Sequence, residues 1–294
     1  MKVALTANPN KPAALALALR AAELLEGKAD VVYSTETAGA LQAGGPSAPL
    51  ESLAADVLVA FGGDGTFLSA LQRSPLPLLP VNAGTVGFLA EIDGDQGTVF
   101  TGAIERLLAG RYYLEERMRI GSEMNGHSFP PATNEVVVHS AQVAKMRQFE
   151  IGIDGRPVGR LRADGVILST PTGSTSYALS ALGPVIDPAV EAIVVAALAP
   201  FRSTQRAVVV DPLKTVSVTL VDAEKEAVVV VDGQGETRVP GGGRLIAFRS
   251  PRKAAFVRFG FGFFRRLHGK NILPWVEETV ETEGRNDADF PSSA

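Results

Sequence analysis

The chain has 294 residues, of which 46% are apolar and 20% are charged, and these values exclude a wholly disordered protein. The net charge of −4 provides no overall attraction to nucleic acid or acidic lipid, so neither a nucleic-acid partner nor a membrane is expected. Because the chain has no cysteine, disulfides and thiolate metal sites are excluded, and we expect a cytoplasmic protein.

Strand and helix patterns alternate over about the first 110 residues. Short apolar runs predict buried strands, and runs rich in alanine and leucine predict helices that end at glycine. We expect strands at 2–6, 30–33, 56–61 and 77–81, helices at 12–26 and 98–109, and an irregular segment at 34–53. Fully apolar strands that alternate with helices favour a parallel, doubly wound, Rossmann-like sheet.

From about Arg111 the pattern becomes that of a mostly antiparallel, β-sandwich-like domain. Aspartate-glycine pairs at 154–155 and 232–233 predict tight hairpin turns. Strands are expected at 136–139, 146–153, 166–169, 207–210, 215–221, 227–231 and 244–248.

A glycine-rich turn, Gly-Gly-Asp-Gly-Thr at 62–66, follows the strand at 56–61 and precedes a helix. A turn from a strand into a helix points backbone N–H groups outward and is suited to phosphate binding, so Gly62, Gly63 and Thr66 are candidate phosphate-binding residues, and Thr66 is also expected to cap the helix. Asp64 would repel phosphate on its own, but it could hold Mg²⁺ or accept a proton from an attacking hydroxyl. The alternative is an ordinary helix entrance in which Asp64 bonds nearby amides.

A second glycine-bearing turn, at 82–89, follows the next strand. The carboxyl ends of parallel strands meet at one edge of a sheet, where such sheets bind ligands. We therefore expect the two turns to lie together.

Polar residues of the β-rich region suggest a nucleotide site. Asn134 and Glu135 can bond a base edge and a ribose, although a polar strand entrance would look the same. Six hydroxyl residues occupy 169–176, next to Tyr177. They suit a polyhydroxylated ligand, and some are expected to cap the short helix that follows.

Together these motifs resemble those of the NAD kinases. The residues that carry the resemblance are Gly-Gly-Asp-Gly-Thr at 62–66, Asn-x-Gly-x-x-Gly-Phe-Leu at 82–89, Asn134-Glu135, Asp164-Gly165, Thr-Pro-Thr-Gly-Ser-Thr-x-Tyr at 170–177 and Asp-Gly-Gln at 232–234. The resemblance implies an α/β domain at 1–112 joined by a returning segment at about 255–276, and a β-rich dinucleotide domain at 113–254. It also implies ATP or polyphosphate as donor, Mg²⁺ and a homo-oligomer, either a dimer or a tetramer. The acidic and polar composition of 277–294 predicts a flexible tail.

By position, the resemblance makes Asp64 the base at the 2′-hydroxyl of the adenosine ribose. The substrate-binding residues that it implies are Gly65, Asn134, Glu135, Lys145, Arg162, Asp164, Thr175, Ser176, Tyr177, Ala178, Leu179, Ser180 and Gln234. Phe201 stands where the family often has histidine, so a polar contact made by that histidine is not expected here.

The leading interpretation is an NAD kinase that uses ATP and Mg²⁺ to make NADP. A lipid kinase of the diacylglycerol type shares the glycine-aspartate turn and remains an alternative. A dinucleotide sensor without catalysis is a third interpretation, disfavoured because a sensor has no use for a carboxylate beside phosphates.

Overall fold

The computed structural model describes the whole chain except residues 85–86, 95–96, 143, 203, 261–262 and 269–294. Met1–Gly260 form one compact unit and Phe261–Ala294 form a second, in which α6 (Phe263–His268) is described. Most of the expected returning segment beyond residue 260 and the whole expected tail at 277–294 lie outside the described residues.

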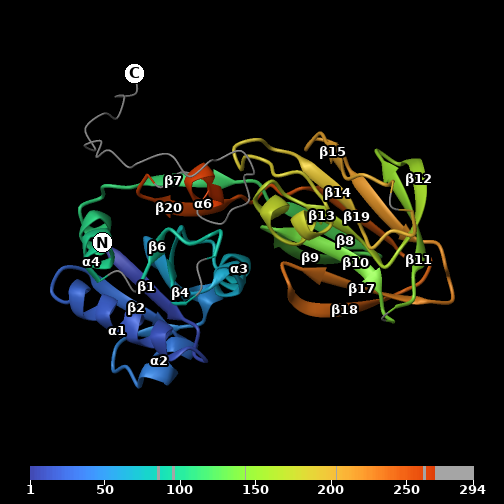
Figure 1. Ribbon diagram of the computed structural model, residues 1–294. Helices are drawn as coiled ribbons and strands as arrows, with labels where there is room; N and C mark the ends of the chain where they lie inside the picture. Colours follow the sequence, from blue (N-terminus) through green and yellow to red (C-terminus); the bar gives the residue numbers. More distant parts are fainter. Residues whose placement is uncertain (85–86, 95–96, 143, 203, 261–262, 269–294) are drawn as a thin grey trace. The chain divides into compact units, whose positions relative to one another are not determined.

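An eight-stranded sheet forms the first part of the large unit (Figure 1). Its order is β3-β2-β1-β4-β5-β20-β7, with β6 also paired to β5. All pairs are parallel except β20 with β7. The strands are β1 (Lys2–Ala7), β2 (Asp30–Ser34), β3 (Ser47–Ala48), β4 (Val57–Gly62), β5 (Leu78–Asn82), β6 (Ile92–Asp93), β7 (Tyr113–Arg117) and β20 (Ala254–Arg258).

Helices pack on both faces of this sheet. Alternate residues of each strand point to opposite faces, so Val3 and Leu5 of β1 pack with α1 (Pro12–Leu25) and α4 (Gly97–Leu108). Ala4 belongs to the core of the other face, with α3 (Asp64–Arg73) and the turn η1 (Leu50–Ser52). The expected doubly wound sheet is therefore confirmed.

Two six-stranded antiparallel sheets form the β-rich part, in the orders β15-β14-β13-β10-β17-β18 and β12-β11-β16-β19-β8-β9. A large apolar core is shared by both sheets, as expected for a β-sandwich. The strands are β8 (Ile120–Met124), β9 (His127–Ala132), β10 (Glu135–Ser140), β11 (Arg147–Ile153), β12 (Arg156–Ala163), β13 (Gly165–Ser169), β14 (Ile193–Leu198), β15 (Val208–Val210), β16 (Val216–Leu220), β17 (Glu226–Val231), β18 (Gln234–Pro240) and β19 (Arg244–Arg249).

The chain returns to the first sheet after the sandwich, because β20 lies between β5 and β7. Strand β7 also belongs to that sheet, through its pairing with β20. The division into domains at residues 112 and 254 remains a proposal within one compact unit.

Some elements differ from the expectation. Segment 34–53 contains α2 (Thr35–Leu41), which begins where the Ser34 hydroxyl accepts the Thr37 amide at 3.3 Å. Strands β9 and β12 were not expected because prolines and exposed polar residues obscure their alternation. The other strands that the sequence analysis missed are β3, β6, β7, β8, β14, β18 and β20.

Candidate active site

Asp64 joins the two glycine turns. It is the first residue of α3, directly after the turn that follows β4. Its Oδ2 accepts a hydrogen bond from the backbone N–H of Phe88 at 2.8 Å, and its Oδ1 accepts one from Leu89 at 3.3 Å. A Cβ on Gly87 would lie 1.9 Å from Oδ1, so only glycine lets the second turn approach this carboxylate.

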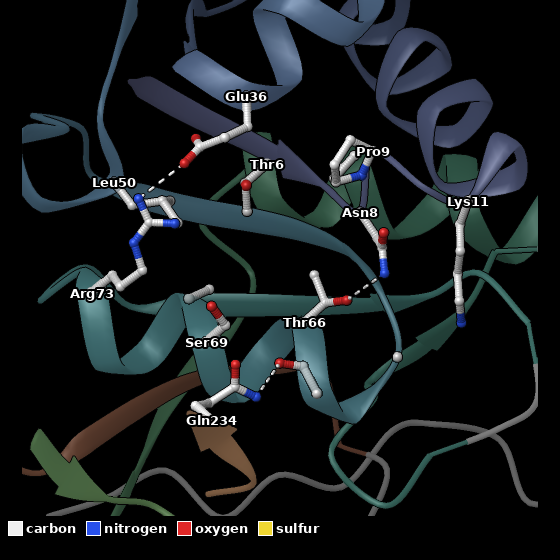
Figure 2. Close-up of a pocket in the computed structure, with 14 residues that line it drawn as sticks. Thr6, Asn8, Pro9, Lys11, Glu36, Leu50, Thr66, Ser69, Arg73 and Gln234 are labelled. Atoms are coloured by element: carbon white, nitrogen blue, oxygen red, sulfur yellow. Dashed lines mark hydrogen bonds and ion pairs between the residues drawn. The ribbon is translucent and has the colours of Figure 1, made fainter. Parts of the chain in front are cut away.

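A cavity of about 450 Å³ opens beside the first turn (Figure 2). Lys11, just before α1, extends its ammonium into this region. Its Nζ lies 3.7 Å from the point where a Cβ would stand on Gly63, and the same distance from that point on Gly84. One cation is therefore close to both turns. The lining residues are Thr6, Ala7, Asn8, Pro9, Lys11, Glu36, Leu50, Gly63, Gly65, Thr66, Ser69, Ala70, Arg73 and Gln234.

Thr66 does not cap α3, contrary to the sequence-based expectation. The N-cap residue is Gly63, and it makes no side-chain cap bond. The Thr66 hydroxyl instead accepts a 3.5 Å bond from the Asn8 amide (Figure 2). Its side chain also fills the space beside Gly62, where a Cβ would lie 2.3 Å from Oγ1. Gly62 is buried, and its packing against Thr66 is sufficient to explain why this position is a glycine.

A second cavity, of about 420 Å³, is lined by Asp64 and by three polar segments of the sandwich. Gly65 lines both cavities, so the two meet at the first turn of α3. The lining residues are Asp64, Gly65, Leu68, Phe88, Leu89, Asn134, Glu135, Thr172, Thr175, Ser176, Asp232 and Gly233.

Asp232 holds the segment that bears Asn134 and Glu135. It occupies the tight turn between β17 and β18, with a positive φ of 52°. Its carboxylate accepts the backbone N–H groups of Thr133, Asn134 and Glu135 at 2.8, 2.7 and 3.1 Å. The Gln72 amide of α3 donates to the same carboxylate at 3.3 Å, which ties the first sheet's helix to the sandwich.

Glu135 lies buried beside Asp232. Burial raises the pKa of Glu135 to about 8, and the negative charge of Asp232 adds to this shift. Burial also raises the pKa of Asp232, although its three backbone N–H bonds act against the rise. The Glu135 carboxyl is therefore mostly protonated at neutral pH and can donate a hydrogen bond as well as accept one.

Most hydroxyls of the loop at 169–176 hold backbone rather than face the cavity. Thr170 Oγ1 donates to the Thr133 carbonyl and Ser169 Oγ to the Asn134 carbonyl. Ser174 and Thr175 donate to carbonyls of their own loop, in the turn η2 (Thr172–Thr175). Thr172, Thr175 and Ser176 line the cavity. The loop thus holds the backbone at Thr133 and Asn134, and fewer of its hydroxyl residues line the cavity than the six in its sequence suggest.

The structure brings together only part of the predicted site. Asp64, Gly65, Asn134, Glu135, Thr175 and Ser176 line the second cavity, and Gly63, Gly65, Thr66 and Gln234 line the first. The predicted residues that line neither cavity are Gly62, Lys145, Arg162, Asp164, Tyr177, Ala178, Leu179 and Ser180. Ala178, in α5 (Tyr177–Ser180), packs in a small apolar cluster with residues of β10, β13 and β14.

Sequence reasoning missed Asn8, Lys11, Gln72 and Asp232. The Asn-Pro-Asn-Lys sequence at 8–11 follows the first buried strand, and this position at the carboxyl edge of the sheet was a usable signal. Asp232 was noted only as part of a motif, because its three amide partners lie about 100 positions away in the chain.

Phe201, the departure from the family pattern, has an aromatic role in this structure. The Arg162 guanidinium lies 5.6 Å from the centre of its ring, and the Phe201 amide donates to the Arg162 carbonyl at 2.8 Å. Phe201 is largely exposed. The pair therefore forms a cation–π contact away from both cavities.

A doubly wound sheet with a carboxylate held between two glycine turns, facing a polar segment of a β-sandwich, defines a nucleotide-dependent phosphotransferase. The comparisons identify the family. Residues 3–112 match the family model of the ATP-NAD kinase N-terminal domain and residues 133–259 that of the ATP-NAD kinase C-terminal domain. The chain belongs to the NAD kinase family, which confirms the resemblance seen in its motifs.

Relatives and solved structures agree with this assignment. The chain is 36% identical over 272 residues to the NAD kinase of Thermoplasma volcanium, covering 92% of this chain and 98% of the relative. It is 41% identical over 226 residues to that of Thermococcus sibiricus, covering 76% and 79%. An Archaeoglobus fulgidus NAD kinase in complex with ATP superposes with a TM-score of 0.74 at 28% identity, covering 92% of this chain and 98% of the other. Yeast NADH kinase complexed with NADH has the same fold, with a TM-score of 0.85 at 20% identity, covering 96% and 90%.

Proposed function

We propose that this protein transfers the terminal phosphoryl group of ATP to the 2′-hydroxyl of the adenosine ribose of NAD, forming NADP. Its membership of the NAD kinase family supports this reaction. The observation that carries the residue assignment is the position of Asp64, which lines one cavity while the adjacent Gly65 lines both. A phosphoryl donor in the first cavity and a ribose in the second would meet at the first turn of α3.

Asp64 acts as general base in this proposal. The amides of Phe88 and Leu89 fix the orientation of its carboxylate, and each oxygen keeps a further lone pair for the hydroxyl proton. A neutral ribose hydroxyl is a weak nucleophile, and general-base assistance contributes about 10²–10⁴-fold in rate. Positioning and charge neutralisation supply the remainder.

The donor phosphates are assigned to the first cavity. The backbone N–H groups at the N-terminus of a helix favour anions, and at the start of α3 Gly63 leaves space for close approach. Lys11 adds a positive charge near both turns (Figure 2). The Archaeoglobus relative, solved with ATP, supports ATP as donor, and polyphosphate remains to be compared with it.

Mg²⁺ is compatible with these residues. Among the described residues no group of three or more acidic or histidine side chains could hold a metal ion, but Mg²⁺ keeps several waters and binds largely to substrate phosphates. Asp64 lines the second cavity beside Gly65, and holding the ion there is the alternative to its role as general base. When bound, the ion would neutralise charge on the transferring phosphoryl group.

The dinucleotide is assigned to the second cavity. Asn134 Oδ1 and Glu135 Oε2 are buried without a hydrogen-bond partner among the described residues. Buried polar atoms of this kind are normally satisfied, so a bound ligand is the natural partner. A protonated Glu135 could donate to one of the ligand's oxygens.

A product assay separates the candidate functions. Incubation with ATP, Mg²⁺ and either NAD⁺ or a diacylglycerol should yield NADP⁺ and no phosphatidate. Phosphatidate would instead support a lipid kinase, and NAD binding without product would support a sensor. Repeating the assay with polyphosphate and with NADH defines the donor and the preferred oxidation state.

A homo-oligomer and a cytoplasmic location also remain proposals. No described helix is long and apolar enough to cross a membrane. Light scattering on the purified protein would give the oligomeric state.

A further inference from the structure

A third cavity, of about 600 Å³, shares Arg73 with the first cavity and is otherwise lined by different residues. It is formed by the C-terminal half of α3 and the residues after it, together with Arg119, Pro131 and the start of β20. Its charged lining residues are Arg73, Arg119, Arg252, Lys253 and Glu51. Four basic side chains therefore face one acidic side chain.

Two of these cations already have counter-charges. Arg73 forms ion pairs with Glu51 at 2.6 Å and Glu36 at 3.0 Å. Lys253 forms pairs with Glu116 at 3.2 Å and Glu191 at 3.6 Å. These two side chains are neutralised by the protein itself.

The other two cations, Arg119 and Arg252, have no ion pair within 4 Å in the part of the chain that the structure describes. Arg119 is only 5% exposed. Its Nη2 donates to the Pro131 carbonyl, but its Nε is buried without a partner among the described residues.

Arg119 and Arg252 also repel each other. Burial lowers the pKa of Arg119, the charge of Asp232 raises it, and the smaller effect of the Arg252 charge lowers it again. A buried guanidinium beside a like charge is unfavourable unless an anion compensates it. Asp232 cannot fill this role fully, because its carboxylate already accepts three backbone amides.

We propose that this cavity is a third ligand site, which binds a phosphate group, either free or carried by a small molecule, between Arg119 and Arg252. Planar guanidinium groups match phosphate oxygens in charge and geometry. The volume is in the range of small-molecule sites and exceeds what inorganic phosphate needs. The chemistry therefore points to a phosphorylated metabolite, with free phosphate as the minimal ligand.

The proposed site adjoins the group that organises the dinucleotide cavity. Gln72 lines the third cavity and donates to both the Val231 carbonyl and the Asp232 carboxylate, at 3.3 Å each. The same Asp232 holds the amides of Asn134 and Glu135. A ligand that contacts Gln72 would therefore be separated from Asp232, which holds the NAD-site segment, by the Gln72 side chain alone.

Calorimetric titration of the full chain tests the proposal, with inorganic phosphate and ribose 5-phosphate as separate probes. Arg252→Glu is the central variant, because Arg252 is exposed and its reversal should not disturb folding. Loss of a charge-assisted contact and its replacement by repulsion should weaken binding about tenfold or more. Arg238→Glu reverses an exposed arginine on β18 that lies outside the cavity, and it should bind both probes as the unaltered protein does.

Lys11→Ala distinguishes the new site from the proposed donor cavity. Binding that survives Lys11→Ala and is lost in Arg252→Glu belongs to the third cavity. Tighter binding of ribose 5-phosphate than of phosphate identifies a phosphorylated small molecule, and equal binding identifies phosphate itself. Undiminished binding by Arg252→Glu, absence of binding by the unaltered protein, or loss only in Lys11→Ala would overturn the proposal.

Discussion

Arg258 and Glu91 form a buried ion pair, with Nη1 3.0 Å from Oε2 and side chains that are 1% and 0% exposed. The same Nη1 donates to the Leu89 carbonyl at 3.0 Å, and the Leu89 amide donates to Asp64. The last strand of the first sheet is therefore connected to the proposed base through a single residue. This connection explains how a strand that returns after the whole sandwich can affect the active site.

Replacing Arg258 by methionine should destabilise the protein and displace the turn that holds Asp64. It removes the Arg258 charge from both Glu91 and Glu115, and breaking a buried pair such as that with Glu91 costs about 3–5 kcal/mol. Denaturant unfolding measures this loss. Arg238→Met is the control, because its pair with Glu226 is largely exposed and should be worth about 1 kcal/mol or less.

The double variant Arg258→Met with Glu91→Gln separates stability from positioning. It also removes the Glu91 charge, so stability should partly recover, whereas the bond to the Leu89 carbonyl stays lost and kcat should stay low. Full recovery of kcat in the double variant would show that Arg258 contributes only to stability.

A methyl group at Gly87 should impair catalysis more than folding. The new Cβ would lie 1.9 Å from Asp64 Oδ1, so the carboxylate must move by about 1 Å or more, and misplacement of that size can cost about 10²-fold in rate. Steady-state kinetics of Gly87→Ala provide the measurement. Gly102→Ala in α4 is the matched control, because nothing lies within 4 Å of its Cβ position. It should gain about 0.5–1 kcal/mol of stability with kcat unchanged.

The meeting of the two glycine turns was predictable from sequence. Both follow apolar strands, and parallel strands place their carboxyl ends at one edge, so the approach of Asp64 to Phe88 and Leu89 follows from topology. The hairpin at Asp232 and Gly233 was also predictable, because an aspartate-glycine pair readily adopts the positive φ angles of a tight turn. The first inference depends on a general property of parallel sheets, and the second depends on a local sequence pattern.

The orientation of individual side chains was not predictable in the same way. Ser174 and Ser176 lie in one loop, yet Ser174 bonds the Ile186 amide while Ser176 faces Glu135. The bond between Gln72 and Asp232 spans 160 positions and arises only when α3 meets the sandwich. Neither composition nor spacing contains that tertiary information.

Asp64→Asn should retain NAD binding and lose most turnover. The amide cannot accept the hydroxyl proton, so kcat should fall about 10²–10⁴-fold. Asparagine also has only one acceptor oxygen for the amides of Phe88 and Leu89, so the second turn loses one bond. Calorimetry with NAD⁺ should show affinity within a few-fold of the original. NADP⁺ formation near the original rate would exclude Asp64 as the base.

Glu135 should make the protein less stable as the pH rises. Its folded pKa of about 8 lies above the ordinary value of 4.5 for a glutamate, so between these two pH values the folded state holds a proton that the unfolded state releases. Stability should therefore fall from about pH 4.5 to pH 8, by at most roughly 1.4 kcal/mol per pH unit. The pKa of Asp232 is raised as well, so its titration also lowers the stability as the pH rises.

Glu135→Gln tests this expectation by removing the titration while keeping a hydrogen-bond donor. Unfolding free energies of the two proteins, measured from pH 5 to pH 9, should diverge in favour of the variant as the pH increases. Glu226→Gln, an exposed carboxyl on β17, should give a curve parallel to that of the unaltered protein. If Glu135→Gln also runs parallel to it, Glu135 is ionised throughout this range and cannot serve as a protonated donor to the dinucleotide.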